Sequence, residues 1–262
     1  MHPSQILARI VLCTATVSAH MQLFYPAPFN ASNNSHRTTE TADTYLEFPY
    51  NCCGENDRWM YPCRGYEKLL GTPDGAPTAT WEAGSTANFS LWGPTELGGN
   101  HHGGSCQIGF STDGDATFRV ATSYEGNCPH RYNGVGPNGQ SFGFKVPSDL
   151  EPGVQLFAWI WYNREKEFNM NCAAVNILSS SQSNSVGDTR TNYASGHAAF
   201  DTRPRMFVAD NGNDCTTPHT SAELKYPEPG LEVVTGDGEY PLELPTGACG
   251  QAEMLAKQAY TG

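Results

Sequence analysis

Apolar and polar positions alternate along the middle of the chain, and this alternation predicts β-strands. In residues 141–146, Phe142, Phe144 and Val146 fall on one face, as in a strand with one side buried. Residues 155–162 are almost all apolar, which is typical of a central strand in a sandwich. Similar signals predict strands over residues 78–81, 87–92, 106–111, 117–120, 171–177 and 206–209.

The number and spacing of these strands predict the fold class. We expect an all-β, antiparallel sandwich of the immunoglobulin or fibronectin III type, with long disulfide-tied loops. The sequence Thr-Asp-Gly-Asp at residues 112–115 is a turn signal that joins two of the strands as a hairpin. Residues 179–192 are polar and predict a loop or linker.

The two ends of the chain lack this periodicity. Residues 20–62 contain Pro26, Pro28 and a tract of Asn, Ser and Thr, so we expect them to wrap the core as a loop. Little predicts a core beyond about residue 230. We therefore expect a sandwich domain over residues 20–230 and a C-terminal tail over residues 231–262, whose structure the sequence leaves unknown.

Composition narrows the possible partners. The 27 glycines and 18 prolines, with only 16% charged residues, favour many turns and few long helices. The net charge of −12, without a cluster of Lys and Arg, excludes nucleic acid as a partner. No apolar run reaches the roughly 18 residues that a membrane-spanning helix needs, so we expect no membrane insertion.

The first residues read as a secretory signal peptide. A short apolar run over residues 6–12 is followed by Val17-Ser18-Ala19, a small-x-small cleavage pattern. This predicts a signal over residues 1–19, a secreted, extracellular protein, and a mature chain that begins at His20. The alternative reading is an amphipathic N-terminal helix.

Cysteines and glycosylation sequons point to the same compartment. Loss of Cys13 with the signal would leave eight cysteines, an even number that predicts four disulfides. Spacing alone does not assign their pairing. The sequons begin at Asn30, Asn33 and Asn88.

An N-terminal His20 would carry distinctive chemistry. Its free α-amine and its imidazole can both bind one metal ion, and a third nitrogen from another histidine would complete a T-shaped set that suits Cu(II). The candidate partners are the adjacent His101 and His102, which lie next to Gly103-Gly104. In such a loop either one could point toward His20, or both could be solvated.

Five motifs follow one another along the chain. They are His-Met at residues 20–21, His-His-Gly-Gly-Ser-Cys-Gln at 101–107, Gly-Asn-Cys-Pro at 126–129, Phe-Ala-Trp-Ile-Trp-Tyr-Asn at 157–163 and Met-Asn-Cys-Ala at 170–173. Their order resembles that in the lytic polysaccharide monooxygenases of auxiliary activity family 11. The resemblance covers roughly residues 20 to 230.

This resemblance implies a copper enzyme that cleaves polysaccharide oxidatively, with insoluble chitin as the expected substrate and an external electron donor. It implies one copper per chain, held by His20 and His101, because the family has one residue between its ligand and Gly-Gly. It also implies the disulfides Cys63–Cys172 and Cys106–Cys128. We expect a monomer.

One position departs from the family pattern. Asn169 stands where the family usually has a tyrosine at the axial position of the copper, and Phe168 is the other candidate for that space. A phenol, a phenyl ring and an amide would tune copper differently. The departure favours an alternative function, a non-catalytic secreted copper-binding protein with a role in storage, uptake or the cell wall. A metal-free polysaccharide-binding sandwich is a third possibility.

Aromatic residues outside the motifs have simpler interpretations. Trp159 and Trp161 are spaced by two on an apolar strand, so we expect both in the core. Tyr25 and Tyr50 lie in the N-terminal loop, where they could stack on sugar rings or pack against the protein.

Overall fold

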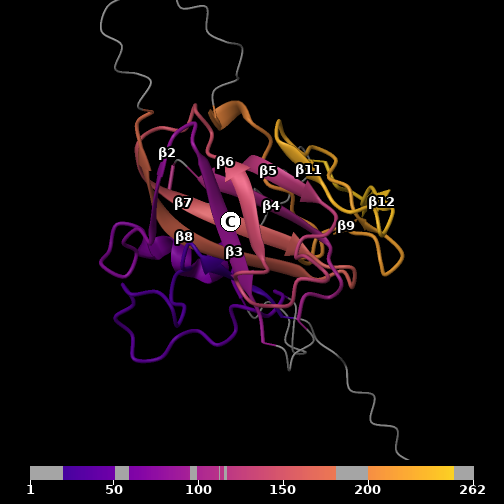
Figure 1. The fold of residues 1–262 in the computed structure, drawn as a ribbon, viewed down its shortest axis with the longest axis horizontal. Coiled ribbons are helices and arrows are strands. Elements are labelled where there is room, and N and C mark those ends of the chain that lie inside the picture. Colours follow the sequence, from indigo (N-terminus) through magenta and orange to yellow (C-terminus); the bar gives the residue numbers. More distant parts are fainter. Residues whose placement is uncertain are drawn as a thin grey trace, which may run out of the picture.

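The computed structural model describes residues 20–50, 59–94, 99–111, 113–114, 117–180 and 200–250. They form two main β-sheets that lie face to face (Figure 1). The smaller sheet has the order β1 (Gln22–Tyr25), β3 (Thr86–Trp92) and β6 (Ser141–Lys145). The larger has the order β11 (Val233–Thr235), β5 (Arg119–Glu125), β4 (Ser105–Ser111), β7 (Gly153–Tyr162), β8 (Phe168–Leu178) and β2 (Ala79–Glu82). The expected β-sandwich is confirmed.

Most of the ladders are antiparallel, including the predicted β4–β5 hairpin, whereas β2 pairs with β8 and β11 with β5 in parallel. The remaining elements are short: η1 (Cys63–Leu69), η4 (Phe200–Thr202), the pair β9 (Cys215–Thr216) and β13 (Thr246–Gly247), and the pair β10 (Glu223–Leu224) and β12 (Leu242–Glu243). No helix in the described ranges is long and apolar enough to cross a membrane. The predicted signal 1–19, Cys52, Cys53, Thr112, Asp115 and residues 181–199 lie outside the described residues.

The main core fills the space between the two sheets. Phe89 and Leu91 of β3 meet Trp159 and Trp161 of β7 there, and all four side chains are buried. Each large apolar side chain stabilises the fold by about 1.5–3 kcal/mol when it is fully buried. The prediction that both tryptophans belong to the core is confirmed.

A second core covers the outer face of the larger sheet. Alternate residues of β7 and β8 point to this side, because side chains alternate along a strand. The N-terminal loop covers them, and its backbone is fixed by hydrogen bonds from Phe29 N to Cys172 O (2.9 Å) and from Tyr50 N to Phe168 O (2.8 Å). The Cys63–Cys172 disulfide fastens η1 to β8 on the same side. The loop therefore wraps the core as predicted.

β1 and residues 206–209 differ from the sequence prediction. The predicted loop over residues 20–62 contains β1, which pairs with β3. Conversely, residues 206–209 form no strand. Met206 N donates to Phe118 O (2.9 Å), but side chains satisfy backbone groups of the residues that follow. Phe207 N donates to Gln107 Oε1 (2.8 Å), and the Tyr162 hydroxyl donates to Phe207 O (2.8 Å) and accepts from Ala209 N (2.9 Å).

The segment after residue 230 contributes to the main sheet. β11 pairs with β5 in the register Val233 to Ser123, and Figure 1 shows this segment, in yellow, along the β5 edge. The Cys215–Cys249 disulfide ties the segment back to β9. The boundary at residue 230 stays a prediction, but the strand beyond it is hydrogen-bonded to the sandwich.

Candidate metal centre

His20 lies immediately before β1, at one end of the sandwich. β1 pairs Gln22 with Trp92, the last residue of β3. The next residue, Gly93, passes so close that a Cβ there would lie 2.3 Å from the His20 carbonyl oxygen. The His20 residue is only 1% exposed, and its ring meets Phe48 edge to face with centroids 3.9 Å apart.

His101 lies in a tight turn that leads into β4. Its φ is +46°, and the three residues after it, His102, Gly103 and Gly104, have φ of +56°, +106° and +114°. This left-handed conformation costs about 1–2 kcal/mol for each residue that is not glycine. Asn100 supports the turn, because its carbonyl oxygen accepts from Gly103 N (2.9 Å) and its Oδ1 from His102 N (3.2 Å).

The turn separates the two adjacent histidines. The His101 side chain is only 3% exposed, whereas His102 is exposed. The His101 ring faces Trp161 at the end of β7, with centroids 6.0 Å apart. Of the two histidines that the sequence offers as partners for His20, His101 is therefore the one whose ring is turned into the protein.

Two carboxylates contact the His101 imidazole. Glu165 Oε1 lies 3.1 Å from Nδ1, and Glu167 Oε2 lies 3.8 Å from Nε2. Within the described ranges these three residues form a group whose ligand atoms all lie within 4.8 Å of one another, and His20 is not part of it. Sequence reasoning missed both glutamates, because no motif marks Glu165 or Glu167 as a neighbour of His101.

Asn163 shapes the turn that presents these glutamates. Its Oδ1 accepts from Glu165 N (2.9 Å) and Glu167 N (3.2 Å), and its Nδ2 donates to the Glu167 carboxylate. Burial raises the pKa of Glu167 to about 7, the Asn163 hydrogen bond opposes this, and the charge of Glu165 adds to it. A carboxyl with such a pKa can exchange a proton near neutral pH.

Two asparagines of β8 point to the same side of the sheet, between the two layers. Asn171 Oδ1 accepts from Leu23 N (2.7 Å) and its Nδ2 donates to Leu46 O (2.9 Å). Asn169 is the ladder partner of Trp161 and is 0% exposed, and among the described residues neither its Oδ1 nor its Nδ2 has a hydrogen-bond partner. Phe168 lies on the opposite face, packed against Tyr50, Tyr61 and Tyr162. Of the two candidates for the axial position, only Asn169 shares a face with Trp161.

These contacts bring His20 and His101 to the same end of the sandwich. His20 is adjacent to β1, which Asn171 holds, and His101 lies against Trp161, which is paired with Asn169. A buried polar group without a partner costs about 1–3 kcal/mol, so the bare amide of Asn169 favours a further ligand at this end. Two imidazoles, with an α-amine once residue 20 becomes the first, form a donor set that fits Cu(II).

Comparison with known proteins identifies the family. No protein-family model matches the chain. The AA11 family lytic polysaccharide monooxygenase A of Aspergillus fumigatus is 36% identical over 219 residues, which cover 81% of this chain and 85% of that protein. The chain belongs to the AA11 lytic polysaccharide monooxygenases. It is therefore an enzyme, and its family implies a copper cofactor.

Other relatives are longer than this monooxygenase. An AA11 family lytic polysaccharide monooxygenase B of Aspergillus fumigatus is 29% identical, and one of Aspergillus oryzae is 28% identical. They match 90% and 89% of this chain, which spans about half of their length, 53% and 52%. A solved cellulose-active polysaccharide monooxygenase from M. thermophila shares 16% identity, with a TM-score of 0.30 over 39% of this chain and 54% of that one.

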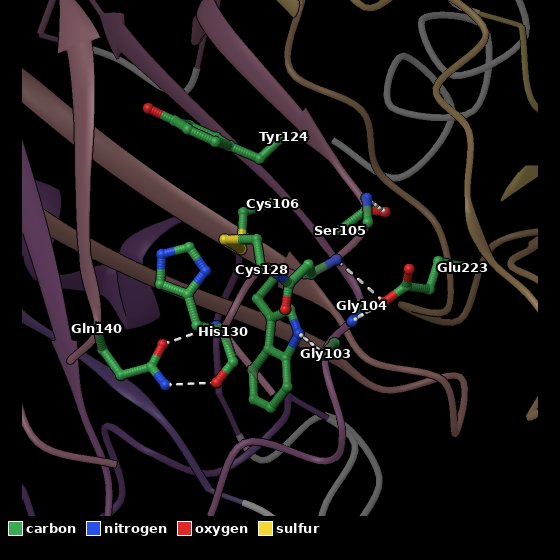
Figure 2. Close-up of a disulfide and its surroundings, with 12 residues drawn as sticks. Gly103, Gly104, Ser105, Cys106, Tyr124, Cys128, His130, Gln140 and Glu223 are labelled. Atoms are coloured by element: carbon green, nitrogen blue, oxygen red, sulfur yellow. Dashed lines mark hydrogen bonds between the residues drawn. A yellow bond between two sulfur atoms is a disulfide. The ribbon is translucent and has the colours of Figure 1, made fainter. Parts of the chain in front are cut away.

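The structure of this monooxygenase contains both disulfides that the family resemblance implies, Cys63–Cys172 and Cys106–Cys128. The second joins β4 to the segment after β5, directly beside the Gly103-Gly104 turn (Figure 2). The backbone that carries His101 is therefore covalently anchored two residues after Gly104.

The remaining sequence candidates differ in their exposure. The side chain of Asn30 is half-buried and donates to Tyr66 Oη (3.1 Å). Asn33 and Asn88 are both exposed, and their amides donate to Phe24 O (2.8 Å) and Ser141 Oγ (3.4 Å). Tyr50 is buried and its hydroxyl accepts from Arg64 N (2.9 Å), while Tyr25 packs edge to face on Trp81.

Proposed function

We propose that this enzyme holds one copper ion through the α-amine and imidazole of His20 and the imidazole of His101, and that it cleaves chitin. The proposal is supported by the burial of both histidines, each placed by strands that meet at the same end of the sandwich, and by the predicted cleavage site before His20. AA11 membership supports copper-dependent oxidative cleavage of polysaccharide.

The proposal requires that the chain be processed. Removal of residues 1–19 frees the amine of His20, so secretion and copper binding depend on the same cleavage. The enzyme acts outside the cell as a monomer and receives electrons from an external donor. Bound copper supplies the redox chemistry that activates oxygen or peroxide for attack on a polysaccharide C–H bond.

The protein contributes orientation and proton control. Trp161 and Glu165 contact the His101 ring on two sides and fix its direction. Glu167, whose pKa burial raises to about 7, can hold or release a proton beside that ring. Asn169 provides an amide oxygen, in place of a phenol, on the face of β8 that points between the sheets.

Chitin is proposed on the strength of the family resemblance. The experiment treats β-chitin and cellulose with secreted, copper-loaded protein and ascorbate, and identifies soluble products by mass spectrometry. Oxidised chitooligosaccharides from chitin alone support the proposal. Oxidised products from cellulose alone would overturn the substrate.

The matched control is a form with one extra alanine before His20. It retains every side chain but lacks the α-amine at His20. Loss of all oxidised products in this form ties the activity to the N-terminal nitrogen. Undiminished products would contradict the proposed ligand set.

A further inference from the structure

A buried ionic network from the C-terminal part of the chain holds the turn that carries His101. Its members are Arg131, Glu223 and Asp237, and the side chains of Arg131 and Glu223 are each only 1% exposed. None of the three belongs to the sequence motifs of the family resemblance. Both acidic members lie far along the chain from Arg131, Glu223 at a separation of 92 residues and Asp237 at 106.

Glu223 binds the turn through its carboxylate. It lies at the start of β10, and its Oε1 accepts from Gly104 N (2.8 Å) and from Asn127 N (3.1 Å). Figure 2 shows this side chain reaching Gly104 beside the Cys106–Cys128 disulfide. The next residue in β10, Leu224, accepts at its carbonyl from Ser105 Oγ (2.6 Å). One short strand thus fixes two consecutive residues after the histidine turn.

Arg131 binds the same turn from its other side. It donates to the carbonyl oxygen of His102, and it forms a two-pronged ion pair with Glu223, with distances of 3.0 Å to Oε1 and 3.2 Å to Oε2. Asp237 completes the network, 2.7 Å from Nη2 and 2.9 Å from Nε. Burial alone would lower the pKa of Arg131, but the hydrogen bonds to Asp237 and Glu223 raise it above its ordinary value.

The contacts around the turn leave no space for a side chain at Gly103 or Gly104. A Cβ on Gly103 would lie 2.3 Å from Arg131 Nη1 and 2.5 Å from Glu223 Oε1. A Cβ on Gly104 would lie 2.7 Å from Trp161 Nε1, the atom that donates to Gly103 O (3.0 Å). The charged pair therefore packs directly on Gly103, while Trp161 and the backbone of Tyr162 pack on Gly104.

We propose that Glu223, held by Arg131, is a positioning residue for the copper site. It fixes the left-handed turn from His101 to Gly104 and so fixes the direction of the His101 imidazole. The inference rests on the proposed role of His101 as a ligand. It makes residues 223–237 part of the catalytic unit, although they lie outside the family motifs.

The test compares Glu223→Ala and Glu223→Gln in the mature, N-terminally processed protein. Glutamine keeps an oxygen that can accept from Gly104 N, whereas alanine removes it. We expect Glu223→Ala to weaken Cu(II) binding by about 10- to 100-fold in calorimetry and to change the electron paramagnetic resonance spectrum. Glu223→Gln should retain most of the wild-type Cu(II) affinity and spectrum. The Gly104 amide should exchange hydrogen faster only in the alanine variant.

The matched control is Asp149→Ala, which breaks the partly buried Arg203–Asp149 ion pair, 2.8 Å long, away from the turn. It should lower the melting temperature without moving the copper spectrum. The proposal is overturned if Glu223→Ala matches the wild type in copper affinity and spectrum. If Glu223→Ala does not fold, Asp237→Ala takes its place. We expect Asp237→Ala to bind Cu(II) several-fold more weakly than the wild type, and an unchanged affinity would contradict the positioning role of the network. His101→Ala binding copper like the wild type would instead overturn the proposed function itself.

Discussion

Asn169 lies directly opposite Trp161 in the β7–β8 ladder, and this pair links the buried amide to the histidine turn. Trp161 donates from Nε1 to Gly103 O (3.0 Å), and its ring faces His101. Within the part of the chain that the structure describes, the Asn169 side chain forms no hydrogen bond, whereas Asn171, two residues further along the same face, forms several. Asn171 therefore supports the fold through its hydrogen bonds, whereas the amide of Asn169 is left for a ligand.

Replacing each asparagine by leucine separates these roles. Asn169→Leu removes an unpaired polar group and should leave the copper-free protein at least as stable as the wild type. Asn171→Leu strands Leu23 N and should cost about 1–3 kcal/mol. Urea unfolding of the copper-free proteins measures both.

The same pair tests the axial role of Asn169. With Cu(II) bound, Asn169→Leu should change the electron paramagnetic resonance spectrum, because the amide lies at the end of the sheet where we propose the copper site. An unchanged spectrum, or a marked loss of copper-free stability, would remove Asn169 from the site.

Gly103 should tolerate no side chain. Gly103→Ala would drive a methyl group into Arg131 and Glu223 at a φ of +106°. We expect a loss of about 1–3 kcal/mol from overpacking, in addition to backbone strain. Gly134→Ala is the control, since its φ is +74° but nothing lies within 4 Å of the added carbon. Equal losses in the two variants would show that packing of the network on Gly103 contributes nothing.

The Cys63–Cys172 disulfide should contribute strongly to stability. It joins residues 109 apart and fastens the N-terminal cover over the outer core. Replacing both cysteines by serine should cost about 2–5 kcal/mol. The free energy of unfolding measures this loss. Removal of the Cys106–Cys128 disulfide should reduce the free energy of unfolding by less, because that disulfide closes a loop of only 22 residues. A larger loss at the shorter bridge would contradict this order.

Asp237 should make stability depend on acid pH. The hydrogen bond from Arg131 holds the pKa of Asp237 below its ordinary value. A lowered folded-state pKa stabilises the protein above the unfolded value of about 3.9, and this contribution is lost as the pH falls below it. The advantage of the wild type over Asp237→Asn in free energy of unfolding should be constant from about pH 5 to 7 and shrink below about pH 4. An advantage that grows in acid would refute the assignment.

The sequence predicted the strands well where burial dictates their composition. β7 is largely apolar on both faces, and so is β8 apart from its asparagines, because one face packs between the sheets and the other lies under the N-terminal loop. The strand predicted over residues 206–209 was wrong, because this apolar, extended segment forms backbone hydrogen bonds with the side chains of Gln107 and Tyr162 instead of with a neighbouring strand.

The histidines could be proposed from sequence because their chemistry depends on residue type and on a cleavage site. Glu165 and Glu167 could not, since their approach to His101 depends on how Asn163 folds the β7–β8 turn. The network around Arg131 was equally hidden, because it joins β10 and the segment after β11 to a turn about a hundred residues earlier.

The central claim is that His20 and His101 together hold copper, and a Cu(II) titration followed by electron paramagnetic resonance tests it most directly. The mature protein that begins at His20 is compared with its His101→Ala variant and with the form that has one extra N-terminal alanine. The account predicts tight one-to-one binding with nitrogen hyperfine structure in the mature protein, and loss of that signal in both altered forms. The same affinity and spectrum in all three proteins would contradict it.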